Sequence, residues 1–259
     1  MNDSLNDTDF DRTALSLGAS YEDETLTWRG RLELRHDEGL TSGSNRDSDT
    51  VAASFAARYK LNDNARFLLA FDGVTSDNAT ASIPDADYAE LTFGYAFRPV
   101  EHDRLNVLAK YQFIYDMTER AGFTAPAGGN FLTTPRQRAH ILSIDASYDL
   151  NRNWTIGGKL GGRWSDQEGA SGFFTSNNAT LGVMNLRYHA VHKWDFLLEA
   201  RQLDAQDVGS QFGVLAAAYR HFGNNLKVGI GYNAGQFSDD LADVTYDDRG
   251  IFLNVVGKF

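Results

Sequence analysis

The sequence contains no cysteine, only 4 prolines among its 259 residues, and no long apolar run. The absence of cysteine excludes scaffolds built on disulfides and metal sites built on thiolates. The longest stretch without a strongly polar residue, around residues 212–219, is far shorter than the roughly 20 residues that a helix needs to cross a bilayer. A bundle of transmembrane helices is therefore excluded, in agreement with the mean hydropathy of −0.40.

Positive charge is also scarce, since 24 Lys and Arg stand against 35 Asp and Glu, for a net charge of −11. This balance argues against nucleic acid as a general partner. The 17 Phe, 11 Tyr and 4 Trp, within an apolar fraction of 42%, exclude a disordered chain. Met1 is followed by the polar segment NDSLND, which is not a secretory signal. The sequence is thus either a cytosolic protein or a mature or trimmed chain with a start Met added.

Apolar residues recur with a period of two, not 3.6, from end to end of the chain. From Leu26, for example, one face carries Leu26, Trp28 and Leu32, and the other carries Arg29, Arg31 and Glu33. About thirteen such runs are present, and all four prolines fall between them, as a ladder that needs every N–H demands. The predicted strands span residues 12–21, 25–36, 50–61, 65–74, 87–98, 105–117, 138–150, 154–165, 179–190, 193–203, 211–221, 226–237 and 249–259.

Short turns alternate with longer, mostly polar loops, which we expect at 37–49, 75–86, 118–137, 166–178, 204–210 and 238–248. This alternation is typical of an outer-membrane barrel, whose turns are periplasmic and whose loops are extracellular. A soluble sandwich also alternates, but thirteen long strands in one meander would enclose an apolar interior too wide to fill. The sequence therefore predicts an all-β, transmembrane up-and-down antiparallel β-barrel of about 13–14 strands over residues 12–259, preceded by a polar segment at 1–11.

Aromatic residues cluster near the predicted strand ends, whereas small residues such as Gly30, Ala53 and Ala217 occupy strand middles. Amphipathic aromatic side chains at both membrane interfaces are expected of such barrels. We predict an aromatic girdle of Trp28, Tyr59, Tyr95, Phe97, Tyr148, Trp154, Trp164, Tyr188, Trp194, Tyr219 and Phe259.

The chain ends in an alternating strand, IFLNVVGKF, with a terminal Phe. This strand resembles the C-terminal recognition strand of Gram-negative outer-membrane proteins, which the assembly machinery reads, with Leu253, Val255, Gly257 and Phe259 as the signal. Residues 86–111, 142–163 and 219–259 are also similar to the C-terminal barrel of large modular proteobacterial surface proteins. That resemblance covers about the last two-thirds of the chain and implies an outer-membrane location and a missing upstream portion. It implies no catalytic residues.

If the apolar face meets lipid, the alternate residues line the interior. The predicted lumen residues are Arg29, Arg31, Glu33, Arg35, Arg58, Arg66, Asp72, Glu90, Arg98, Lys110, Asp116, Asp145, Lys159, Arg163, Arg187, Glu199, Arg201, Arg220 and Lys227. Basic residues outnumber acidic ones here, so the interior favours anions or zwitterions modestly. The alternative is that these charges pair across strands and fill the interior. The loop at 118–137 is a candidate to fold into the mouth and narrow it.

Chemistry beyond conduction finds little support in the sequence. The acidic loop at 238–248 offers carboxylates for Ca²⁺ but lacks EF-hand spacing, so a solvated loop is the preferred interpretation. Neither G-x-S-x-G nor H-E-x-x-H occurs, and His140 and Ser143 fall on opposite faces of one strand. We expect no enzyme, no cofactor and no metal site.

Thirteen strands conflict with the even number usual in bacterial barrels. A miscounted strand, a missing preceding strand and an N-terminus outside the cell all remain open. The favoured function is a passive pore for small hydrophilic solutes; the alternatives are an anchor or translocator for an absent N-terminal surface region, and a barrel-embedded hydrolase. The expected partners are the bilayer, lipopolysaccharide, the outer-membrane assembly machinery and the solutes, and no nucleic acid.

Overall fold

The structure is a computed structural model that describes residues 10–41, 44–79, 85–118, 136–168, 172–190, 193–206, 209–223, 226–235, 241 and 250–257. Its fourteen strands form one sheet in which neighbours along the chain pair antiparallel, except that the short β9 pairs only with β8. In the described residues no helix is long and apolar enough to cross a membrane. The strands are β1 Phe10–Glu22, β2 Leu26–Thr41, β3 Ser44–Lys60, β4 Ala65–Asn78, β5 Asp87–Phe97, β6 Leu105–Asp116, β7 Gln137–Asp149, β8 Trp154–Glu168, β9 Phe174–Ser176, β10 Ala179–Ala190, β11 Trp194–Ala205, β12 Gly209–Phe222, β13 Leu226–Asn233 and β14 Gly250–Gly257.

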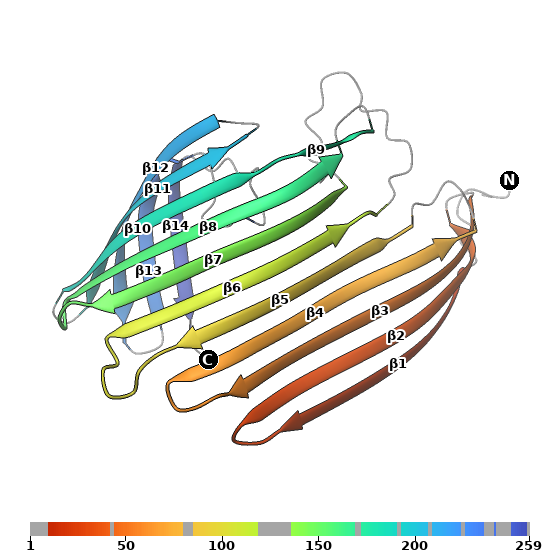
Figure 1. The fold of residues 1–259 in the computed structure, drawn as a ribbon, viewed down its shortest axis with the longest axis horizontal. Coiled ribbons are helices and arrows are strands. Elements are labelled where there is room, and N and C mark those ends of the chain that lie inside the picture. The colour runs from red at the N-terminus through yellow and green to blue at the C-terminus, as the bar shows by residue number, and fades with distance from the viewer. Residues whose placement is uncertain are drawn as a thin grey trace, which may run out of the picture.

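The strands run up and down side by side, with short turns at one end, at the lower left of Figure 1, and longer connections at the other. Every one of the thirteen predicted runs is a strand, so the all-β antiparallel up-and-down prediction is confirmed. The sheet curls, which brings β13 and β14 behind the other strands in this view (Figure 1).

The strands extend further toward the long-connection end than the sequence predicted. Most of the expected loop 37–49 is paired strand in β2 and β3, and the expected loop 166–178 contains the end of β8 and all of β9. The sequence predicts loops for these segments because they lack apolar alternation. Beyond the bilayer both faces of a strand meet polar surroundings, so pairing there needs no apolar face. The expected loop 118–137 lies almost wholly outside the described residues, as do residues 1–9.

The same kind of side-chain to backbone hydrogen bond stabilises three of the short turns. The carboxylate of Asp23 accepts hydrogen bonds from the backbone N–H groups of Thr25 and Leu26, at 2.7 and 2.6 Å. The Asn151 side chain accepts from the N–H groups of Asn153 and Trp154, and Asn62 accepts from that of Asn64. Asx side chains that accept from the backbone two residues on are a known turn-forming feature, and they occupy N–H groups where no strand partner exists.

The sheet is open among the described residues: β1 pairs only with β2, and β14 pairs only with β13. Residues 11–22 of β1 are exposed on both faces, as expected of an edge strand. Because thirteen strands lie on the path from one edge to the other, β1 and β14 run in the same direction. Antiparallel closure of the sheet therefore requires an odd number of further strands between them.

The Asp23 turn predicts a pH dependence of stability. Hydrogen bonds from the N–H groups of Leu26 and Thr25 and from the Tyr21 hydroxyl hold the pKa of Asp23 below its ordinary value of 3.8. The stabilisation is therefore present above pH 3.8 and is lost as the pH falls through the lower folded-state pKa. We expect Asp23→Ala to lower the urea midpoint of unfolding in lipid vesicles. Asp23→Asn keeps the hydrogen-bond acceptor and should therefore lower the urea midpoint less than Asp23→Ala does. In this variant the midpoint should also depend less on pH between about pH 5 and about pH 2. Identical pH profiles for the three proteins would contradict this role.

The edge geometry predicts which cysteine pairs cross-link in a chain that has no native cysteine. Leu17 and Leu32 are register partners in β1 and β2, so Leu17→Cys with Leu32→Cys should oxidise to a disulfide within one chain. Leu17→Cys with Leu253→Cys in β14 should not, since the two edges do not pair. The measurement is gel mobility of the membrane-inserted protein with and without reductant. An efficient intramolecular bridge in the second pair would show direct parallel closure instead.

Candidate pore lining

The register divides the side chains of the whole sheet into two continuous faces. Starting from Leu17, the partners Leu32, Ala53 and Gly73 follow from strand to strand on one face, and this face continues without interruption to Leu253 in β14. We call it the apolar face, because Leu, Ile, Val, Phe, Tyr, Trp and small residues dominate it. The opposite face, which we call the polar face, carries most of the charged side chains of the strands.

Burial shows which face is turned outward. Nearly all large exposed hydrophobic side chains of the strands lie on the apolar face, among them Leu160 at 71% and Met184 at 64% exposure. Several charged groups on the polar face are buried instead: Asp37 is 0% and Arg163 is 3% exposed. This is the reverse of a water-soluble protein, in which charged residues are almost never fully buried and large apolar patches are rarely exposed. The apolar face is thus suited to lipid and the polar face to the interior.

The polar face carries every predicted lumen residue except Arg98 and Arg220. Arg98 follows the end of β5 and lines a hollow of about 720 Å³ at the short turns of β4–β7, together with Arg66, Asp103 and Asp145. Arg220 is on the apolar face: its register partner is Trp194, and its guanidinium lies 5.6 Å from the Trp194 ring and 5.1 Å from the Phe222 ring. The prediction of Arg220 as a lumen residue is wrong.

Nine of the predicted girdle residues lie on the apolar face, in register with one another or with other apolar residues: Trp28, Tyr59, Tyr95, Phe97, Tyr148, Trp154, Trp164, Tyr188 and Trp194. Tyr219 does not. It is the register partner of Asp195 and Gly229, and its ring occupies the space where a Cβ at Gly229 would lie. The alternating pattern does not determine the face of Tyr219 in the segment LAAAYR at 215–220, because alanine is compatible with either face. Phe259 lies outside the described residues, whereas Leu253 and Val255 are exposed on the apolar face.

In the half of the sheet nearer the long connections, several charged groups on the polar face are paired. Asp37 accepts from Arg12 Nε at 2.7 Å and lies 3.3 Å from Arg35 Nε. Arg201 pairs with Glu199. Sequence reasoning missed Arg12 and Asp37, although their place in the alternating pattern puts them on the polar face.

Arg163 links the sheet to a segment outside it. Its guanidinium donates to the Gln137 side chain and, at 2.7 Å, to the backbone carbonyl of Leu241. Leu241 is only 2% exposed and packs with Ile114, Ile141, Ala179, Leu181, Val183, Leu203 and other apolar residues of the polar face. The expected acidic loop 238–248 therefore places at least this residue against the interior wall. The rest of that loop, including its candidate Ca²⁺ carboxylates, lies outside the described residues.

Near the short turns, one buried carboxylate organises the β10–β13 part of the polar face. Asp195 accepts hydrogen bonds from His189 at 2.9 Å, from His221 at 2.8 Å and from Lys227 at 2.6 Å. Lys227 also lies 4.6 Å from the Tyr219 ring. No group of three or more His, Asp or Glu among the described residues is arranged to hold a metal ion.

Four guanidinium groups of this half make no ion pair with a described residue, unlike Lys60, which pairs with Asp63 at 2.6 Å. Arg29, Arg58 and Arg66 lie on the consecutive strands β2, β3 and β4, and all three are exposed toward the interior. Arg187 on β10 is also exposed. Arg29 and Asp72 line a second hollow of about 500 Å³ on the wall formed by β2–β4. The polar face is therefore not filled by mutual pairing of its charges: its short-turn half presents free guanidinium groups next to open space.

No protein-family model matches the sequence, and no curated protein matches it. The structure is similar to solved outer-membrane proteins. A siderophore receptor, PirA, from Pseudomonas aeruginosa aligns at TM-score 0.59 and 12% identity over 89% of this chain. PirA from Acinetobacter baumannii aligns at TM-score 0.58 and 11% identity, again over 89%. The outer-membrane channel DcaP of Acinetobacter baumannii aligns at TM-score 0.55 and 10% identity, over 95% of this chain and 85% of its own.

The chain spans only 42% and 41% of the lengths of the two receptors. At these identities the likeness concerns the fold alone, and the narrower resemblance to modular surface proteins stays a prediction. The exposed apolar face and these structural neighbours agree: the chain has the fold of the transmembrane β-barrels of the outer membrane.

Proposed function

We propose that this protein is an integral outer-membrane protein that forms a passive pore for small hydrophilic solutes, with a weak preference for anions. One observation carries the proposal: an apolar face turned outward and a polar face whose guanidinium groups Arg29, Arg58 and Arg66 stay free of ion pairs among the described residues. A lining whose guanidinium groups are not neutralised by ion pairs concentrates anions near them. Solutes that carry a carboxylate or a phosphate, or that are zwitterionic, fit this lining best.

Conduction also requires a closed wall, because an open sheet edge in lipid leaves unpaired backbone N–H and C=O groups. The parallel directions of β1 and β14 exclude their direct antiparallel pairing, so the proposed pore includes at least one strand beyond those described. This chain aligns with less than half of each siderophore receptor. A longer protein of this fold can therefore supply the further strands. In the cell we expect lipopolysaccharide to cover the long-connection end, and the assembly machinery to bind the last strand through Leu253, Val255, Gly257 and Phe259.

Planar-bilayer recording tests the proposal directly. We expect a stable open conductance level. In a salt gradient, the reversal potential should have the sign of an anion-selective pore. Absence of any open level would contradict the pore and favour the anchor or translocator role. Release of fatty acids or peptides by the same preparation would instead favour a barrel-embedded hydrolase.

The three free arginines should set the selectivity. Replacing Arg29, Arg58 and Arg66 together with Gln should lower the anion-to-cation permeability ratio at least about twofold, because the local positive potential falls, while the open level remains. Arg138→Gln is the control on the other face: it removes one guanidinium group from the apolar face, where Arg138 pairs with Asp166 across β7 and β8. An equal shift in the control and the triple variant would show that the selectivity does not arise at these arginines.

A further inference from the structure

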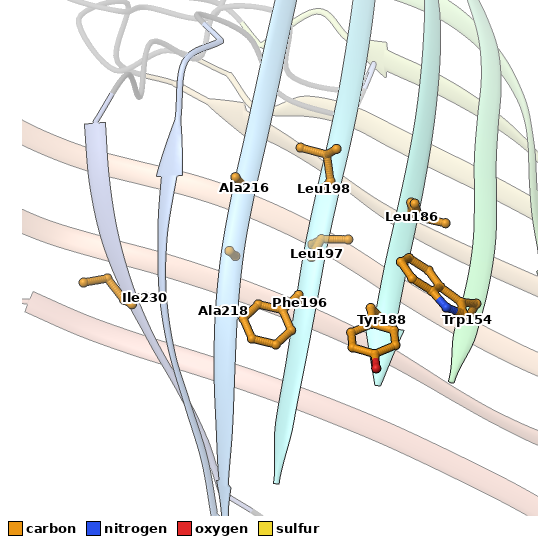
Figure 2. A pocket seen from close by; sticks show the side chains of 10 residues that line it. Trp154, Leu186, Tyr188, Phe196, Leu197, Leu198, Ala216, Ala218 and Ile230 are labelled. Carbon is orange, nitrogen blue, oxygen red and sulfur yellow. The ribbon is translucent and has the colours of Figure 1, made fainter. Parts of the chain in front are cut away.

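A hollow of about 560 Å³ lies on the apolar face, over β12, and is not explained by conduction. Its floor is formed by Ala216 and Ala218, and larger side chains rise on both sides, as Figure 2 shows. Phe196 and Leu198 on β11 are the register partners of these alanines on one side, and Ile230 on β13 faces Ala218 on the other. Trp154, Leu186 and Tyr188 complete the wall beyond β11. The result is a groove that has its floor on β12 and extends over the neighbouring strands from β8 to β13.

The groove faces the bilayer, because eight of its ten lining residues belong to the apolar face; the other two, Leu197 and Ala217, alternate with them along β11 and β12. A void in this position would forfeit the dispersion contacts of its lining atoms. Apart from the Tyr188 hydroxyl and the Trp154 indole N–H, the side chains of the lining offer water no hydrogen-bond partner. An acyl chain matches the apolar chemistry of the lining.

A single cation stands at the short-turn end of this groove. Arg220 is the next residue after Ala218 on the same face of β12, so its Cα lies about 7 Å further along the strand. All other charged strand residues described on the apolar face, such as Arg138 and Asp166, lie toward the long-connection end. Arg220 makes no ion pair with a described residue, and it is exposed.

Two aromatic rings hold the Arg220 side chain at the surface. Its guanidinium carbon lies 5.6 Å from the Trp194 ring and 5.1 Å from that of Phe222, on neighbouring positions of the same face. Such stacking uses the faces of the guanidinium and leaves its N–H groups, which lie in the plane, available to an acceptor. Trp194 is placed near a strand end, where interfacial Trp residues meet the lipid headgroups.

We propose that a bilayer phospholipid binds here, with its phosphate diester hydrogen-bonded to Arg220 and one acyl chain in the groove over Ala216 and Ala218. Guanidinium and phosphate form paired, charge-assisted hydrogen bonds. The charge of the site and the depth at which it lies both select a phospholipid over an uncharged lipid. The proposal rests on the transmembrane fold and is independent of conduction.

Native mass spectrometry of the detergent-solubilised full chain tests the site. After delipidation, the protein is incubated with phosphatidylglycerol or with a diacylglycerol of the same chains, and bound lipid is counted. We expect one retained phosphatidylglycerol per chain. Arg220→Gln, which removes the charge, and Ala218→Phe, which fills the groove, should each lower its occupancy at least about tenfold. Arg220→Lys keeps the charge but lacks the paired N–H donors. Its phosphatidylglycerol occupancy should lie between that of these two variants and that of the parent.

Two matched controls separate the site from general effects. Arg58→Gln removes an arginine near the short turns from the polar face, and Ala109→Phe enlarges a small residue of the apolar face on β6; both should retain the lipid. Heat-modifiable gel mobility confirms that each variant is folded. Equal retention by Ala218→Phe and Ala109→Phe would overturn the proposal, and so would retention of diacylglycerol equal to that of phosphatidylglycerol. A change of oligomeric state in Ala218→Phe without loss of lipid would assign the groove to a second copy of the chain and would also overturn it. The bilayer conductance of Ala218→Phe should match that of the parent, so this test and the pore test fail separately.

Discussion

The whole structure depends on the need to pair every backbone N–H and C=O group inside a bilayer, where water does not replace a missing partner. The continuous ladder from β1 to β14 meets that need with strands alone, except along the outer edges of β1 and β14. The ladder also determines chemistry, because side chains alternate with a period of two and paired residues share a face. A slip of one residue in any pair would turn every following side chain to the other side. The contrast between an exposed apolar face and a partly buried polar face is therefore a direct consequence of register.

The sequence is sufficient to predict the strands in which one face must be apolar and the other polar. The alternation of Leu32 with Arg31 and Glu33 is one example, and all thirteen runs of this kind are strands. Prediction failed in two kinds of place. Residues 37–41 and 44–49 form strands in which neither face needs to be apolar, so they carry no alternating signal. In β12, three consecutive alanines precede Tyr219 and Arg220, and a methyl group suits either face. The face of those two residues follows only from hydrogen bonding to β11 and β13.

The interior electrostatics could be predicted only in outline. The sequence shows an excess of cations at alternate positions, but partners depend on which residues meet across strands. Asp37 satisfies Arg12 and Arg35 near the long connections, and Asp195 gathers His189, His221 and Lys227 near the turns. What remains is a set of guanidinium groups on β2, β3 and β4 that make no ion pair with a described residue, although Asp72 lines the same hollow as Arg29. Selectivity would thus arise from the guanidinium groups that remain without an ion pair. It would not follow from the net charge of the whole chain, which is negative.

Arg220 shows how strongly the lipid environment limits exceptions to this pattern. A charged side chain on the lipid face is most costly at the middle of the bilayer and cheapest near the interface, and Arg220 lies two residues before the end of its strand. There it can stack on Trp194 and Phe222 while its N–H groups reach the headgroup region. A purely structural role would be served as well by an uncharged aromatic or aliphatic residue, as at the equivalent strand ends elsewhere on this face. The cation is tolerated at the one depth where phosphate is available to it, and it stands beside the groove whose floor small residues leave open. The position and the groove therefore have a common explanation in a bound phospholipid.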